Sequence, residues 1–272
     1  MWIVLVLLVV LVLFIVSKIR KKFKTLSPLG TITVCTGAVK TGKTTLAVSL
    51  ACRAYRKELF SYKIRSLFNH DLEKPLLYSN IPLNMEYVPV TTNILLRKER
   101  IVPKSVMLLD EASLVADSQY IKDNVVNMQL LKFFKLFGHY SHGGSLIIDT
   151  QSISDLHYAI KRCINNYLYI QRTRSVPLFL IMDVIEQRYS DDGTVLSTQT
   201  EDVDNTLRHT IISKKVWSKF DTYCYSVLTD KKPINNAVID GREHTLKTMN
   251  IPSFRDWTEK EETKETPKND KK

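Results

Sequence analysis

A glycine-rich segment near the start of the chain carries residue types that bind phosphate. Residues 37–44 match the pattern GxxxxGK[ST] at every fixed position. In this pattern backbone N–H groups surround an anion, the lysine reaches the β- and γ-phosphates, and the last hydroxyl ligates Mg²⁺. We therefore predict binding of ATP and Mg²⁺ by Gly37, Ala38, Val39, Lys40, Thr41, Gly42, Lys43, Thr44 and Thr45.

Two acidic residues that end an apolar run supply a second chemical element. Residues 106–111 read Val-Met-Leu-Leu-Asp-Glu, which is typical of a buried strand followed by a Walker B acid pair. Asp110 is expected to hold Mg²⁺ together with Thr44, and Glu111 to act as the general base on the attacking water. Because a second acid serves water as the nucleophile, this ending favours hydrolysis. The alternative for Glu111 is a structural position beside a helix N-cap.

Further candidates follow the next predicted strands. Residues 145–151 are apolar and then polar, so Gln151 is expected at the carboxyl end of a strand, where it could sense the γ-phosphate or its attacking water. Arg162, Arg172 and Arg174 lie at the ends of later predicted elements. Each is a candidate arginine finger for a neighbouring subunit, with a solvated surface arginine as the alternative.

The elements needed to position these residues can be read from hydrophobic periodicity. An α/β fold of the P-loop NTPase type is predicted, with a mostly parallel sheet flanked by helices and one transmembrane helix before it. Predicted strands occupy 31–36, 106–109, 145–151 and 167–171, and predicted helices occupy 45–57, 125–137 and 153–163. A hairpin is expected from 178–189 and 193–200, turning at 191–193. Beyond 201 the pattern weakens, and 214–220 is expected to be a surface segment.

The first residues of the chain have a different character from the rest. Residues 2–17 carry no charge, and a basic cluster follows at once: Lys18, Arg20, Lys21, Lys22 and Lys24. Residues 1–19 are just long enough to cross a bilayer core, and the basic flank predicts a cytoplasmic domain with the N-terminus outside. A cleaved signal is disfavoured because the basic residues follow the apolar run. A buried core helix is disfavoured because no polar face is present.

Composition sets the remaining limits. The net charge is +11, and five of the positive charges belong to the basic cluster, so the rest permits a nucleic-acid partner without requiring one. The four cysteines form no CxxC pair and are expected to be buried and reduced. The predicted organisation is 1–19 transmembrane helix, 20–30 basic linker, 31–200 ATPase domain, 201–257 C-terminal extension of that domain and 258–272 disordered charged tail.

Four tracts together resemble the Zot-like family of filamentous phage morphogenesis ATPases. They are the phosphate loop, Leu77–Pro82 (LYSNIP), 108–113 (LLDEAS) and 148–155 (IDTQSISD). The resemblance implies a ring-forming ATPase of the host inner membrane that acts with phage coat or assembly proteins and extrudes single-stranded DNA. It transfers the Walker roles to Lys43, Thr44, Asp110 and Glu111. In that family the membrane helix usually follows the ATPase domain, whereas here the apolar segment comes first. Gly138-His139 also stands where an Arg-His pair is common.

Other functions share part of this pattern. A DNA-packaging or conjugative translocase of the FtsK/HerA-like group would use the same Walker residues and a strand-end glutamine. A membrane scaffold that binds nucleotide without hydrolysing it is the non-enzymatic alternative, and the presence of Glu111 argues against it. A nucleoside kinase fits less well, because the chain shows no arginine-rich lid pattern and such kinases have no need of an anchor.

Overall fold

The computed structural model describes residues 28–112, 125–187, 207–220, 236–239, 242–245 and 247. The predicted transmembrane helix, nearly all of the basic linker, the turn at 191–193 and the charged tail lie outside the described residues. Within the described residues, no helix combines the length and apolar character needed to cross a membrane.

One eight-stranded sheet forms the centre of the molecule, in the order β3-β2-β4-β5-β1-β6-β7-β8. From β3 to β6 neighbouring strands run parallel, whereas β7 and β8 are antiparallel additions at one edge. This confirms the predicted mostly parallel α/β sheet. The strands are β1 Ile32–Gly37, β2 Leu77–Ser79, β3 Val88–Pro89, β4 Val106–Leu109, β5 Ser145–Asp149, β6 Asn166–Ser175, β7 Phe179–Gln187 and β8 Leu207–Ser213. A separate antiparallel pair consists of β9 Asn236–Ile239 and β10 Arg242–Thr245.

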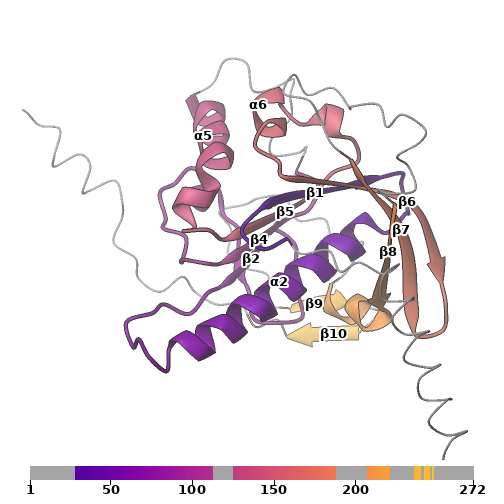
Figure 1. Ribbon diagram of the computed structural model, residues 1–272, viewed down its shortest axis with the longest axis horizontal. Coiled ribbons are helices and arrows are strands. Elements are labelled where there is room, and N and C mark those ends of the chain that lie inside the picture. The colour runs from indigo at the N-terminus through magenta and orange to yellow at the C-terminus, as the bar shows by residue number, and fades with distance from the viewer. Residues whose placement is uncertain are drawn as a thin grey trace, which may run out of the picture.

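Helices cover both faces of the sheet (Figure 1). The long helix α2, Lys43–Arg65, packs on one face, where its buried residues join those of β7 and β8 in one apolar cluster. The opposite face is covered by α3 Thr92–Leu95, α5 Val125–Tyr140 and α6 Tyr158–Lys161. Because central parallel strands are covered on both sides, they form continuous apolar runs, and every residue of β1 is buried.

Two predicted elements differ in the structure. The single helix expected over 153–163 is instead a 3-10 turn, η1 Ile153–Asp155, followed by the short helix α6. The break occurs because Leu156 is extended and the side chains of Ser152 and His157 each cap a new start, accepting from Ser154 N and Ala159 N. Helix α2 also continues to Arg65, eight residues beyond the predicted end at Lys57.

The region after 201 is more ordered than its pattern indicates. The described partners of β7 are β6 and β8, while the predicted hairpin arm 193–200 lies outside the described residues. Strand β8 was missed because only one of its faces is buried, through Thr210 and Ile212. The predicted surface segment 214–220 is a 3-10 helix, η2 Lys214–Lys219, which buries Val216 and the following Phe220 against α2.

Candidate nucleotide-binding site

The phosphate loop connects the carboxyl end of β1 to the first residue of α2. Two of its residues have left-handed backbone, Lys40 at φ 65° and Gly42 at φ 87°. Gly37 lies so close to β6 that an added Cβ would be 3.0 Å from the Ile170 carbonyl oxygen and 2.9 Å from Thr41 Oγ1. These conformations curl successive N–H groups around one point, which is the arrangement that binds phosphate.

Lys43 crosses this loop. Its side chain is buried, and Nζ donates a 3.3 Å hydrogen bond to the carbonyl oxygen of Gly37. The ammonium therefore lies over the concave side of the loop, where the β- and γ-phosphates of a nucleotide would bind.

The remaining predicted loop residues have distinct surroundings. Thr41 donates from Oγ1 to the Ala38 carbonyl at 2.7 Å, which closes the loop on itself, and Val39 is exposed. The Thr45 hydroxyl accepts a 3.3 Å hydrogen bond from Trp217 Nε1 of η2. Thr45 is therefore expected to contact phosphate only through its backbone N–H.

Three oxygen-bearing side chains meet beside the loop. Thr44 Oγ1 donates to Asp149 Oδ2 at 2.8 Å, and Asp149 ends β5, the strand between β1 and β4. Asp110 follows β4 directly. Asp110 Oδ1 and Asp149 Oδ1 are both buried, and neither accepts a hydrogen bond from any described residue.

The electrostatics of this cluster favour a cation. Burial, followed by the charge of Asp110 and a hydrogen bond to it, raises the pKa of Asp149 well above 3.8, and Thr44 and Lys43 only partly oppose this. Two facing carboxyls must share a proton or bind a cation. Hard oxygen ligands of this kind suit Mg²⁺, which uses one or two carboxylates and completes its shell with phosphates and water. Among the described residues, no group of three or more His, Cys, Asp and Glu could hold a metal ion.

Asn80 holds the backbone of Asp110 from the neighbouring strand. Its Oδ1 accepts from Asp110 N and its Nδ2 donates to Asp110 O, both at 2.8 Å. Asn80 is buried and directly follows β2, which pairs with β4. The tract 77–82 therefore positions the Walker B acid, a role that sequence reasoning did not assign. Asp149 was also missed as a functional residue, although it ends an apolar strand in the same way as Asp110.

Glu111 and Gln151 lie side by side at the open end of the site. Gln151 Nε2 donates to Glu111 Oε1 at 3.4 Å, and Ala112 N donates to the Asp149 carbonyl at 2.9 Å. Glu111 has φ 48°, a left-handed conformation that is unfavourable for a residue with a Cβ and is concentrated at functional sites. The predicted base and the predicted sensor are thus adjacent, and their catalytic roles stay predictions.

The three candidate arginines differ in their partners. Arg174 Nη2 forms a 2.9 Å salt bridge with Asp183 Oδ2. The other carboxylate oxygen of Asp183, Oδ1, lies 2.8 Å from His209 Nδ1. The Arg162 guanidinium lies 5.9 Å from the ring centre of Tyr158. Arg172 is exposed and has no salt bridge with a described residue. Between the two β6 arginines, Thr173 Oγ1 donates to the Thr41 carbonyl at 2.6 Å, which ties this strand to the phosphate loop.

Comparison with known proteins gives structural likeness only. No protein-family model matches the chain, and no curated protein matches it in sequence. The chain is similar to the solved N-terminal domain of zonular occludens toxin from Neisseria meningitidis, with 14% identity, 71% of this chain and 100% of that one covered, and a TM-score of 0.46. It is also similar to the genome packaging NTPase B204 from Sulfolobus turreted icosahedral virus 2 in complex with ATP-gammaS, with 14% identity, 62% and 96% coverage and a TM-score of 0.30. The solved structures similar to this chain thus include a member of the family that its motifs resemble.

Proposed function

We propose that this chain is a membrane-anchored P-loop ATPase that powers filamentous phage assembly and extrudes single-stranded DNA through the host inner membrane. The Thr44–Asp149–Asp110 cluster beside the phosphate loop is the observation that carries the ATPase part. The membrane and phage parts rest on the apolar residues 1–19, the basic cluster after them and the sequence resemblance.

Each group at the site has a task in hydrolysis. The loop N–H groups and Lys43 bind the phosphates. Thr44, Asp110 and Asp149 would hold Mg²⁺, which would supply positive charge to the phosphates. Glu111 accepts a proton from the water whose oxygen attacks the γ-phosphorus, while the bond to the bridging oxygen breaks and ADP leaves. Gln151, next to Glu111, orients that water.

The proposed assembly is a ring of identical chains on the cytoplasmic side of the membrane. A neighbouring subunit would insert an arginine at the open end of the site, where Glu111 and Gln151 lie. The phage coat or assembly proteins and single-stranded DNA are the proposed partners of this ring. The sequence resemblance supports these assignments.

ATP turnover by the full chain tests the enzymatic part. We expect Mg²⁺-dependent hydrolysis in the wild type and a loss of at least about 100-fold in Lys43→Ala and Glu111→Gln, since each removes a transition-state contact. Lys132→Ala, an exposed lysine on α5, is the matched control. Normal hydrolysis by either site variant would overturn the assignment, and nucleotide binding without any turnover in the wild type would establish the scaffold alternative.

The nucleic acid distinguishes the motor classes. Single-stranded DNA should stimulate the wild-type ATPase more than double-stranded DNA of the same length. Stronger stimulation by the duplex would replace extrusion with a packaging or conjugative translocase of the FtsK/HerA-like group.

A further inference from the structure

A basic cavity lies along α2. It has a volume of about 630 Å³, and residues of α2, β8 and η2 line it together with Leu29. We call it the α2 cavity. Among the described residues, its lining contains no carboxylate and five cationic side chains: Arg53, Arg56, Lys57, Lys215 and Lys219.

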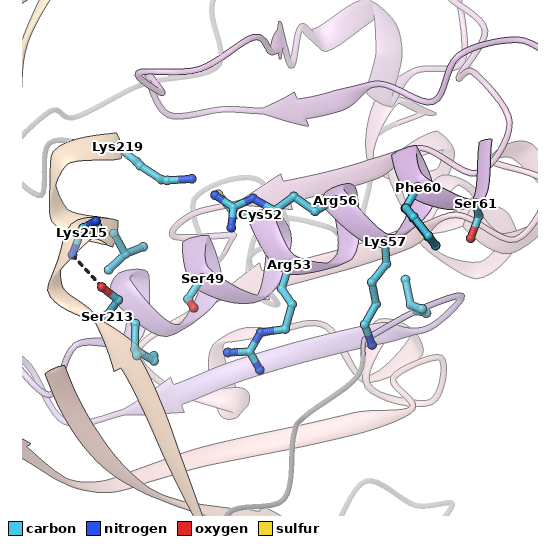
Figure 2. Close-up of a pocket in the computed structure, with 13 residues that line it drawn as sticks. Ser49, Cys52, Arg53, Arg56, Lys57, Phe60, Ser61, Ser213, Lys215 and Lys219 are labelled. Atoms are coloured by element: carbon cyan, nitrogen blue, oxygen red, sulfur yellow. Dashed lines mark hydrogen bonds between the residues drawn. The ribbon is translucent and has the colours of Figure 1, made fainter. Parts of the chain in front are cut away.

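Two cations of the α2 cavity converge. Figure 2 shows Arg56 and Lys219 directed toward each other beside Cys52, whereas Arg53, one helical turn earlier, is directed to another side of α2. Both Arg56 and Lys219 are near enough to Cys52 to lower its thiol pKa, although burial has the larger and opposite effect. Arg53 is partly buried, and that burial lowers its pKa. None of these three forms a salt bridge with a described residue. Like charges held together in this way favour an anionic ligand.

Exposed apolar side chains continue from the rim of the cavity to the end of α2. Phe60 lines the cavity and is 66% exposed, and Ile64 follows one turn later at 47%. Leu67 and Phe68, in the turn after the helix, are 73% and 87% exposed. We call these four residues the apolar tip. Lys63 and Arg65 flank it. Apolar side chains bordered by basic ones are typical of surfaces that lie in the membrane interface.

The chain path puts this surface near the predicted anchor. Leu29 lines the α2 cavity and lies only ten positions after residue 19, where the predicted transmembrane helix ends. Ten extended residues span at most about 35 Å. Leu29 also precedes β1, so this end of the α2 cavity lies at the amino end of that strand. The other end of the cavity is formed by η2, whose Trp217 contacts Thr45 in the first turn of α2.

We propose that the α2 cavity binds the phosphate headgroup of an anionic phospholipid, while the apolar tip enters the bilayer interface. This inference rests on the proposed membrane anchor. A nucleic-acid backbone would satisfy the cations, but it has no contact to offer Ile64 or Leu67. A lipid satisfies both parts of the surface.

Hydrogen exchange of the full chain in lipid nanodiscs tests the proposal. Peptides from residues 53–68 are compared in phosphatidylcholine and in phosphatidylcholine mixed with phosphatidylglycerol. We expect slower exchange with the anionic lipid. Arg56→Glu/Lys215→Glu, both at exposed positions, should abolish the slowing, because each cation near an anionic surface changes docking roughly fivefold.

Two further variants isolate the cause. Lys132→Glu/Lys135→Glu makes the same charge change on α5, at the opposite face of the sheet, and should keep the slowing. Leu67→Ser/Phe68→Ser leaves the charge unchanged and should weaken the slowing. Equal exchange in the two lipids, equal loss in the α5 control, or slowing that requires added single-stranded DNA would each overturn lipid binding.

Failure of the proposed ATPase function can be distinguished from failure of lipid binding. ATP turnover is measured separately in detergent, where we expect Arg56→Glu/Lys215→Glu to hydrolyse ATP at the wild-type rate. Absence of turnover in the wild type would overturn the ATPase and leave the exchange result valid. A wild-type chain that does not enter nanodiscs would overturn the anchor, and exchange with preformed anionic vesicles would then decide whether the α2 cavity binds lipid.

Discussion

Thr44 at the start of α2 donates a 2.8 Å hydrogen bond to Asp149 at the end of β5. This contact joins the residue after the phosphate-binding lysine to a buried carboxyl 105 positions later. It exists because β5 lies between β1 and β4, which brings both strand-end acids to the same side of the loop. The proposed Mg²⁺ site therefore depends on strand order as much as on the two Walker motifs.

Asp149→Asn tests the importance of that buried carboxyl. The amide retains an acceptor for Thr44 but cannot supply a charge to Mg²⁺, so ATP turnover should fall by about 10- to 100-fold. In chelator the same variant should unfold at a higher temperature than the wild type, because it lacks a carboxyl whose ionisation is opposed by burial and by the charge of Asp110. Wild-type turnover in Asp149→Asn would show that Asp110 and Thr44 suffice.

The pH dependence of stability follows from the raised pKa of Asp149. The folded state keeps a proton that the unfolded chain releases above 3.8. The contribution of this carboxyl to the free energy of unfolding is therefore complete below pH 3.8. It falls as the pH rises from there toward the raised pKa. Urea unfolding in chelator at several pH values should show this loss in the wild type and not in Asp149→Asn. Equal slopes in the two proteins would contradict it.

Asn80→Ala should act on the metal through the backbone of Asp110. Both hydrogen bonds to that residue are lost, which leaves buried backbone groups unsatisfied at a cost of about 1–3 kcal/mol. The Mg²⁺ concentration for half-maximal ATPase should rise, which a general loss of folded protein would not produce. Asn84→Ala is the matched control, since Asn84 instead bonds Ser218 of η2.

Glu111 should show a conflict between stability and activity. Glu111→Gln keeps the left-handed backbone and should bind ATP without hydrolysing it. Glu111→Gly removes the side chain and also the strain at φ 48°, so it should be more stable than Glu111→Gln by about 1 kcal/mol. Chemical denaturation of the two inactive variants measures the difference, and equal stability would refute the strain.

Of the two candidate arginines on β6, Arg172 is the one that the ion pairs favour as the finger, because Arg174 is paired with Asp183 and Arg172 has no salt bridge with a described residue. Arg172→Ala should lose ATPase by about 10³-fold at unchanged stability. Mixing it with Glu111→Gln should restore part of the activity, since intact sites form between unlike subunits. No recovery on mixing would mean that Arg172 does not act across an interface.

The elements that carry the chemistry were predictable because their signals are local. A β-branched run, an eight-residue loop pattern with four fixed positions and a helix are contiguous, and the acid pair directly ends its own strand. The role of Asp149 follows only from the pairing of β1 with β5, in which Cys35 lies opposite Asp149. This pairing places Asp149, rather than Gln151, beside Thr44. The role of Asn80 follows from the pairing of β2 with β4, and no spacing in the sequence predicts that pairing.

Strand β8 at the edge of the sheet and the α2 cavity could not be predicted from the sequence, because each depends on contacts between distant parts of the chain. Strand β8 is buried on one side only, so its apolar pattern is weak. The cavity forms where α2 meets η2, about 160 residues further along the chain, and its basic residues look like an ordinary solvated face in the sequence. Their convergence depends on tertiary packing.

Helix α2 is uninterrupted over 23 residues, from the phosphate-binding lysine to the apolar tip. Its length is about 34 Å. A rod of that length is a lever. A tilt of about 5° at the nucleotide end displaces the far end by about 3 Å. Each cycle of ATP binding and product release at the loop would thus press or lift the subunit against its support, converting a small local rearrangement into a stroke directed along the molecule.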